Sequence, residues 1–141
     1  MTTKVTTTGQ LAAIGGYKVR RQSIAWTADA SGNVSEVLQI AGIDNNKFQG
    51  EILNARFIPG SGDDQPDDQY DVTLTDEDGV DILLGQGTDL SNSVRKMFAP
   101  AVESTDGTAT GLVPLAVHST LTLAVSGAGN AKKGTIVLYM R

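Results

Sequence analysis

The chain of 141 residues has the length of one domain, and its composition of 40% apolar and 19% charged residues excludes a disordered or fibrous protein. It has no cysteine, which excludes disulfide bonds, thiolate metal sites and a cysteine nucleophile. Its net charge of -5 opposes binding to nucleic acid, and no apolar run reaches the roughly 20 residues of a membrane-spanning helix, so we expect a soluble protein with neither partner.

The first sixteen residues are rich in threonine and contain little that would pack in a core. Five of the first eight residues are threonine. Residues 1–16 are therefore predicted to be an N-terminal arm, and residues 17–141 the β-sandwich domain. Two interpretations of the arm stay open: a disordered terminus, or a segment whose Thr6, Thr7 and Thr8 add a strand to the sheet edge of a neighbouring chain.

The first predicted strand of the domain changes parity along its length. Tyr17 and Val19 lie on one parity, whereas Ile24 and Trp26 lie on the other. One extra residue moves every later side chain to the opposite face of a sheet, so the change predicts a β-bulge.

Turn residues separate the strands that follow. The turn at 29–33 predicts a hairpin that leads into a strand over 34–40, and a second turn at 42–46 leads into a strand over 48–58. The next loop is predicted to be solvated, with a weak calcium site as the alternative, although the EF-hand spacing is absent. Its aspartates are Asp63, Asp64, Asp67, Asp68 and Asp71.

The middle of the chain contains one clear pattern and one long connection. Apolar and polar residues alternate over 70–75 and again over 80–84, on either side of a Glu-Asp-Gly turn, which predicts a hairpin. Residues 85–111 have little strand signal. Within them, Asp89 as an N-terminal cap predicts one short helix over 90–97.

The carboxyl-terminal part alternates once more. Strands are predicted over 113–117 and 121–125, and Pro114 indicates an edge position for the first of them. The glycine-rich turn at 127–133 predicts a hairpin with a last strand over 135–140.

Together these elements amount to about eight antiparallel strands with no helical period long enough for a βαβ unit. The predicted fold class is therefore all-β, as a two-sheet β-sandwich with an extended N-terminal arm. The unequal loops favour a Greek-key arrangement, and a jelly roll ranks before an immunoglobulin-like sandwich or a barrel.

Residues with catalytic chemistry are few. His118 and Ser119 are adjacent, and neighbouring residues of a strand point to opposite faces, so they do not form a nucleophile and base. One histidine without cysteine is a poor zinc site, and the glycines at 127–135 lack the spacing of a phosphate-binding loop. We therefore expect no enzyme, no cofactor and no metal.

Cations that are adjacent in the sequence are the candidate partner contacts. Each pair is either solvated surface or a contact with an acidic partner. The pairs are Arg20 and Arg21, Arg95 and Lys96, and Lys132 and Lys133. Met97 and Phe98 follow the second pair, as an apolar anchor with a charged rim or as loop residues that pack on the core.

Two segments resemble parts of known proteins. YDVTLTDEDGVDILLGQGTDLSNS, residues 70–93, and STLTLAVSGAGNAKKGTIVLYMR, residues 119–141, are similar to segments of small structural proteins of tailed bacteriophages. Within that group, the size and the jelly-roll prediction point to head decoration (cement) proteins. The resemblance implies a virion protein on the capsid surface, which forms a dimer or trimer with itself and clamps subunits of the major capsid protein.

Two other functions remain as alternatives. One is another virion position, in the tail or at the head-to-tail joint. The other is a carbohydrate-binding β-sandwich module, which needs an aromatic platform and for which only Trp26 offers a tryptophan.

Overall fold

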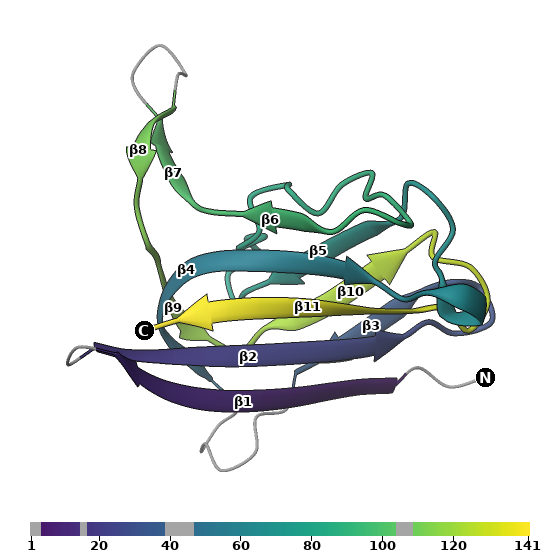
Figure 1. The fold of residues 1–141 in the computed structure, drawn as a ribbon, viewed down its shortest axis with the longest axis horizontal. Helices are drawn as coiled ribbons and strands as arrows, with labels where there is room; N and C mark the ends of the chain where they lie inside the picture. Colours follow the sequence, from purple (N-terminus) through teal and green to yellow (C-terminus); the bar gives the residue numbers. More distant parts are fainter. Residues whose placement is uncertain (1–3, 15–16, 39–46, 104–108) are drawn as a thin grey trace.

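The computed structural model describes the backbone of residues 4–14, 17–38, 47–103 and 109–141. Side chains are described for Val5 and for residues 19–38, 47–100 and 113–141. In this part of the chain, two antiparallel sheets pack face to face, which confirms the predicted all-β sandwich (Figure 1). Within the same residues there is no helix long and apolar enough to cross a membrane.

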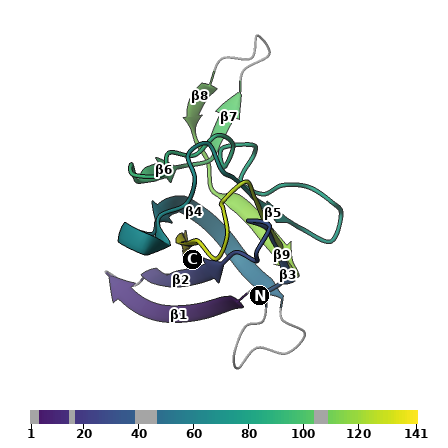
Figure 2. The same cartoon turned by 90° about the vertical axis from the view of Figure 1, so that its right-hand side faces the viewer.

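The larger sheet has six strands: β1 (Lys4–Ile14), β2 (Tyr17–Thr27), β4 (Phe48–Pro59), β6 (Lys96–Phe98), β9 (Leu115–Ser119) and β11 (Lys133–Met140). The smaller sheet has three strands: β3 (Val34–Val37), β5 (Asp71–Thr75) and β10 (Thr122–Ser126). The remaining elements are a separate two-stranded hairpin of β7 (Ala101–Glu103) and β8 (Ala109–Leu112), and a short 3-10 helix, η2 (Gly62–Asp64). Figure 2 shows that the hairpin projects beyond the sandwich.

The strand order is that of a jelly roll. The larger sheet runs β1-β2-β11-β4, and β6 and β9 pair with opposite ends of β4; the smaller sheet runs β3-β10-β5. Strands that follow one another in the chain therefore lie in different sheets, as β2 and β3, β4 and β5, and β10 and β11 do. The connections cross from one sheet to the other, which is the arrangement of two interlocked Greek keys.

Two predicted hairpins are wrong for this reason. The turns at 29–33 and 127–133 do reverse the chain, but each carries it to the other sheet. They lie against each other: the Ala128 amide donates to the Gly32 carbonyl oxygen at 3.0 Å, and the Ala131 amide donates to the Asp29 carbonyl oxygen at 3.1 Å. Turn residues favour a reversal of the chain, but only the packing of the two sheets decides which strand the chain meets next.

The predicted hairpin over 70–84 is half right. Its first strand is β5, but the second is a series of turns in which only Asp81 bridges to Thr75. The Asp81 carboxylate accepts hydrogen bonds from the Leu74, Leu83 and Gly85 amides at 3.0 to 3.1 Å. These bonds replace a strand ladder, and the alternating apolar residues enter the core from turns instead.

The predicted helix over 90–97 is wrong, and so is the prediction of a connection without strands. Asp89 has a φ of 51°, Leu90 bridges to Tyr70, and β6 begins at Lys96. The amide and carbonyl of Leu90 bond to the chain before β5, at 2.9 and 3.0 Å. Those bonds hold the segment extended where local propensity alone favoured a helix.

The predicted β-bulge in the first strand is also wrong. β2 pairs with β11 without a register shift, so its parity is constant. Gln22, Ile24 and Trp26 all point inward, and Gln22 is buried although its Oε1 has no hydrogen-bond partner. The apparent change of parity arises because a polar residue, Gln22, occupies a core position.

The remaining predicted strands are found with shifted ends. Residues 48–58 form β4, 121–125 overlap β10 and 135–140 lie in β11. The segment 113–117 overlaps β9, which pairs with β4 alone, as predicted for an edge strand. The turn at 42–46 lies outside the described residues.

One core joins the two sheets. It contains Ile24 and Trp26 from β2, Leu74 from β5 and Leu138 from β11, each at most 2% exposed. The rings of Trp26 and Tyr70 meet at 5.7 Å, and burial raises the pKa of Tyr70 to about 12.

Residues 4–14 of the predicted arm form β1. This strand pairs along its whole length with β2 of the same chain, from Lys4 opposite Thr27 to Ile14 opposite Tyr17. The strand that the threonine-rich segment adds is therefore the first strand of the chain's own larger sheet. Side chains of Thr6, Thr7 and Thr8 lie outside the described residues.

Candidate contact surface

The outward face of the larger sheet carries an unusual group of exposed and half-buried side chains. Cross-strand register places Arg21 of β2, Tyr139 of β11 and Asn54 of β4 opposite one another. One step along the sheet, Arg56 of β4 lies opposite Met97 of β6. We name the four residues Arg21, Arg56, Met97 and Tyr139 the outer face.

Aromatic, apolar and cationic groups are combined on the outer face. The Arg56 guanidinium lies over the Tyr139 ring, 4.7 Å from its centroid. Met97 is 63% exposed. Val137 is 1% exposed but is not part of the core cluster, so outward side chains cover it. Tyrosine, methionine and arginine are enriched in the centres of protein interfaces, so this composition is that of a contact surface.

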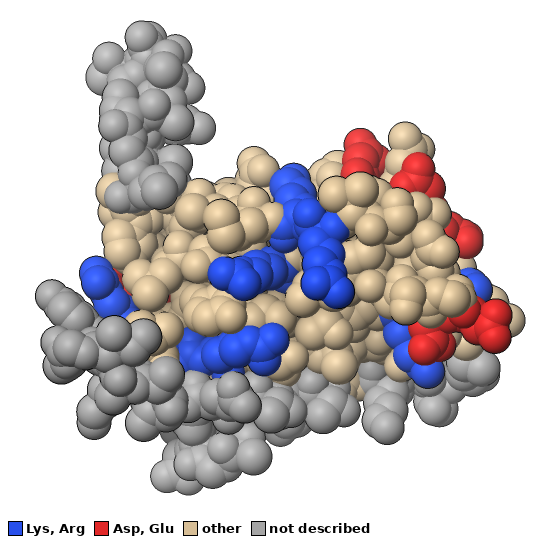
Figure 3. Space-filling view, in the orientation of Figure 1, with Lys and Arg blue, Asp and Glu red and all other residues tan. Residues whose placement is uncertain are grey.

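Charge is segregated on the molecule. Figure 3 shows Lys and Arg over the middle of the larger sheet, without Asp or Glu among them, whereas acidic residues gather at one end. Among the described residues, the three salt bridges involve Lys47, Lys133 and Arg141, and none involves Arg21 or Arg56. The outer face is thus a basic surface on an acidic protein.

The predicted cation pairs separate in the structure. Arg21 belongs to the outer face, whereas its neighbour Arg20 donates to the Gln49 carbonyl oxygen. Arg95 is exposed, whereas Lys96 donates to the Gln86 carbonyl oxygen at 2.7 Å. In each of these two pairs, one cation is held by a backbone carbonyl oxygen of the same chain, so the two members of a pair are not equivalent.

The third pair is bound to the chain's own acidic loop. Lys132 donates to the Asp63 carbonyl oxygen at 2.9 Å, and the Lys133 ammonium lies 3.1 Å from the Asp64 carboxylate. Of the predicted apolar anchor, Met97 is exposed and Phe98 is 8% exposed within the core. Their opposite roles again follow from strand alternation.

The acidic loop contains no metal-binding cluster. Its carboxylates instead accept hydrogen bonds from backbone amides, Asp68 from Asn92 at 3.1 Å and Asp71 from Asp89 at 2.8 Å. No group of three or more histidine, aspartate or glutamate side chains within the described residues is placed to hold a metal ion.

Arg95 also lines an open pocket of about 270 Å³ beside the carboxyl end of β4. The other lining residues are Pro59, Gly60, Ser61, Gln65, Asn92 and Ser93. Gln65 donates to the Asn92 carbonyl oxygen at 3.1 Å, which ties the two walls of the pocket together. Arg95 is the one charged residue among the described residues of this lining, and it stands two residues before Met97 of the outer face in the chain.

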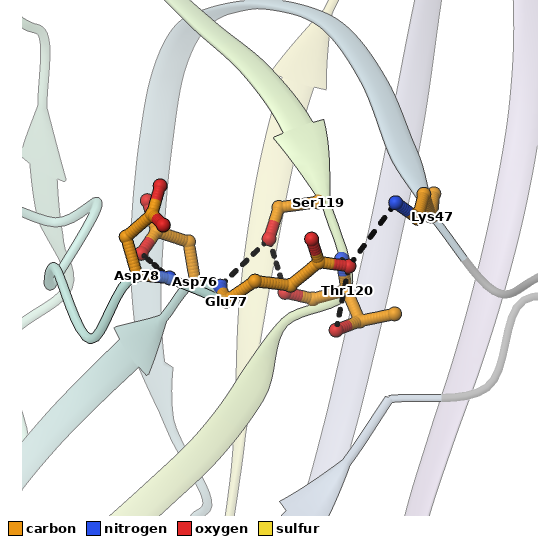
Figure 4. Close-up of polar contacts among 6 residues, drawn as sticks. All are labelled: Lys47, Asp76, Glu77, Asp78, Ser119 and Thr120. Carbon is orange, nitrogen blue, oxygen red and sulfur yellow. Dashed lines mark hydrogen bonds and ion pairs between the residues drawn. The ribbon is translucent and has the colours of Figure 1, made fainter.

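The polar cluster around Glu77 is built as a clamp between loops (Figure 4). The Glu77 amide donates to Ser119 Oγ at 2.8 Å, and Ser119 Oγ donates to the Thr120 carbonyl oxygen at 2.8 Å. In return, the Thr120 amide donates to the Glu77 carboxylate, which also lies 3.3 Å from the Lys47 ammonium. The Ser119 hydroxyl is thus engaged, and His118 is on the opposite, exposed face of β9.

Glu77→Gln is expected to reduce thermal stability at neutral pH. The hydrogen bond from the Thr120 amide, then the bond from Lys47, lower the pKa of Glu77 from 4.5. A lowered pKa in the folded state adds stability above the unfolded pKa, and this stability is lost as the pH falls through the folded pKa. The difference in Tm between the two proteins should therefore disappear in acid, as thermal unfolding at several pH values would show.

Asp78→Asn is the matched control, because it removes a neighbouring carboxylate from the same turn. Among the described residues, the Asp78 carboxylate has no hydrogen bond or ion pair, and its amide donates to Asp76 Oδ1 at 3.0 Å. Its pH profile should follow that of the unchanged protein. If both substitutions lower the Tm equally, the loss of stability comes from the change in net charge and not from the contacts of Glu77.

The described aromatic residues do not form a sugar platform. Trp26 is 2% exposed, and Phe48, Phe57 and Tyr70 are equally buried. Among described side chains, Tyr139 alone of the aromatics is partly exposed, and its ring is covered by Arg56.

Sequence reasoning found Arg21 and Met97 of the outer face and Arg95 of the pocket, and missed Arg56 and Tyr139. Those two lie in strands that were predicted, so the missing information was which strands are neighbours. Alternation around the buried Ala55 and Leu138 could have placed Arg56 and Tyr139 on outward positions. No known protein family, curated protein or solved structure matches the chain.

Proposed function

We propose that this protein is a non-enzymatic structural component of a phage virion, which binds the capsid exterior and stabilises contacts between major capsid subunits. The observation that supports it best is the outer face, where Arg56 stacks on Tyr139 beside the exposed Met97. The face is supported by a rigid sheet, which is suited to binding a flat protein surface. The resemblance of residues 70–93 and 119–141 to phage structural proteins supplies the capsid as partner.

The engagement of the candidate catalytic groups favours a binding role. The Ser119 hydroxyl both donates and accepts a hydrogen bond, and His118 lies on the other face of the strand. A nucleophile needs a base within hydrogen-bond reach, and this geometry does not offer one.

Carbohydrate binding is less well supported than protein binding. Its aromatic platform depended on Trp26, which is buried in the core against Tyr70. A sugar would also need the Tyr139 ring face that Arg56 covers.

Electron cryomicroscopy of purified particles of the encoding phage tests the proposal. We expect density for the chain in many copies on the outside of the head, between capsid subunits. A single ring of copies in the tail or at the head-to-tail joint would replace the proposal by that alternative. Absence from purified particles would exclude any virion role.

A further inference from the structure

The free edge of the larger sheet is long and poorly protected. β1 is an edge strand of eleven residues, and in the described chain it pairs with β2 alone. The unpaired amides and carbonyls of such an edge can pair with another strand. Other edges are short: β9 has five residues, β3 four and β6 three.

β1 lacks the features that usually prevent strand addition. Proteins protect exposed edges with proline, charge or a bulge. The segment KVTTTGQLAAI has no proline, and its one charged residue is Lys4, at the start of the strand. Its pairing with β2 has no register shift. Within the part of the chain that the structure describes, no strand pairs with this edge of β1 anywhere along its length.

We propose that β1 pairs antiparallel with β1 of a second copy of this chain, about a two-fold axis at Gly9. In that register all eleven residues find a partner, with Lys4 opposite Ile14, Thr6 opposite Ala12 and Gly9 opposite Gly9. The two lysines lie at the far ends of the pair, so no like charges meet. An isologous two-fold contact of this kind is the commonest way in which identical chains associate.

The dimer would join two larger sheets into one. The two-fold axis of an antiparallel strand pair is perpendicular to the sheet, so the outward faces of both copies point to the same side. Two copies of Arg21 and Arg56 would then lie on one continuous surface. The pairing itself does not depend on the proposed function, and its test needs no other protein.

Disulfide trapping tests the register. The chain has no cysteine, so Gly9→Cys introduces a single thiol at the axis. Opposite residues of an antiparallel pair have Cα atoms about 5 Å apart, which suits a disulfide. We expect oxidised Gly9→Cys to run as a covalent dimer. Thr6→Cys is the control, because two copies of residue 6 lie about 20 Å apart in this register and should not cross-link.

Charge variants test the same edge without oxidation. Thr6→Lys with Ala12→Lys places like charges opposite each other, and Thr6→Glu with Ala12→Glu does so with the other sign. In sedimentation velocity, each double variant should dimerise at least 10-fold more weakly than the unchanged protein. An equimolar mixture of the lysine and glutamate variants should dimerise again. That recovery would also show that both variants fold. Ser35→Lys with Val37→Lys puts the same charge on the exposed β3 edge, and should change nothing.

Three outcomes would overturn the proposal. One is an unchanged protein that stays monomeric up to about 1 mM. Another is cross-linking of Thr6→Cys as efficient as that of Gly9→Cys. The third is a charge mixture that stays monomeric although both variants give the circular dichroism spectrum of the unchanged protein.

Discussion

Gly32→Ala is expected to destabilise the fold by about 3 kcal/mol, which corresponds to a Tm about 10 °C lower for a chain of this size. Gly32 has a φ of 83°, a conformation that costs energy for any residue with a Cβ. A Cβ at this position would lie 2.5 Å from the Gly129 nitrogen. Because that atom belongs to the backbone of the other crossing connection, the two connections would have to separate. Chemical denaturation measures the loss.

Gly79→Ala is the matched control for Gly32→Ala. Gly79 has a φ of 82°, yet no atom lies within 4 Å of the position its Cβ would take. It should therefore show the conformational cost alone, about 1 kcal/mol. If both substitutions cost the same, the close approach of the 29–33 and 127–133 turns does not contribute to stability.

Replacing Arg21 and Arg56 together with glutamine should weaken attachment to capsids at least 10-fold, or about 1.4 kcal/mol. The two cations have no carboxylate partner among the described residues, so a partner can use their full charge. Loss of Arg56 also removes the guanidinium that covers Tyr139. Binding is measured by co-sedimentation with shells assembled from the major capsid protein of the encoding phage.

Lys132→Gln with Lys133→Gln is the matched control, because it removes the same charge at the acidic loop and not on the outer face. These lysines contact Asp63 and Asp64 of the same chain, so attachment should persist while the loop becomes less stable. Equal loss of attachment in both double variants would show that net charge alone guides binding. Unchanged attachment of the arginine variant would exclude the outer face as the contact.

The fold class could be predicted because alternation is a local property. Residues 71–75 and 121–125 alternate apolar and polar side chains, and residues 136–140 are an apolar run after a glycine-rich turn; each lies in or overlaps a strand. The positions of the turns could be predicted in the same way, since glycine and aspartate act on the chain next to them. Gln22 shows the limit of this reasoning, because a buried polar residue imitates a bulge.

The candidate site was only partly predictable. Arg21 and Met97 were chosen for their composition, and on the larger sheet Met97 is exposed and Arg21 is half-buried. Lys132 and Lys133 looked equivalent in sequence, but the acidic loop that binds them is about 70 residues away along the chain. No local pattern contains such a contact.

The sequence by itself determined that this is an all-β protein of two sheets with turns near 29–33 and 127–133, because strand periodicity and turn chemistry depend on neighbouring residues. Only the tertiary structure decided that those turns cross between sheets, that β1 completes the larger sheet as a free edge, and that Arg56 meets Tyr139. Each of these depends on which distant strands pair. Pairing is decided by how the two sheets bury their shared core, which is a property of the whole chain.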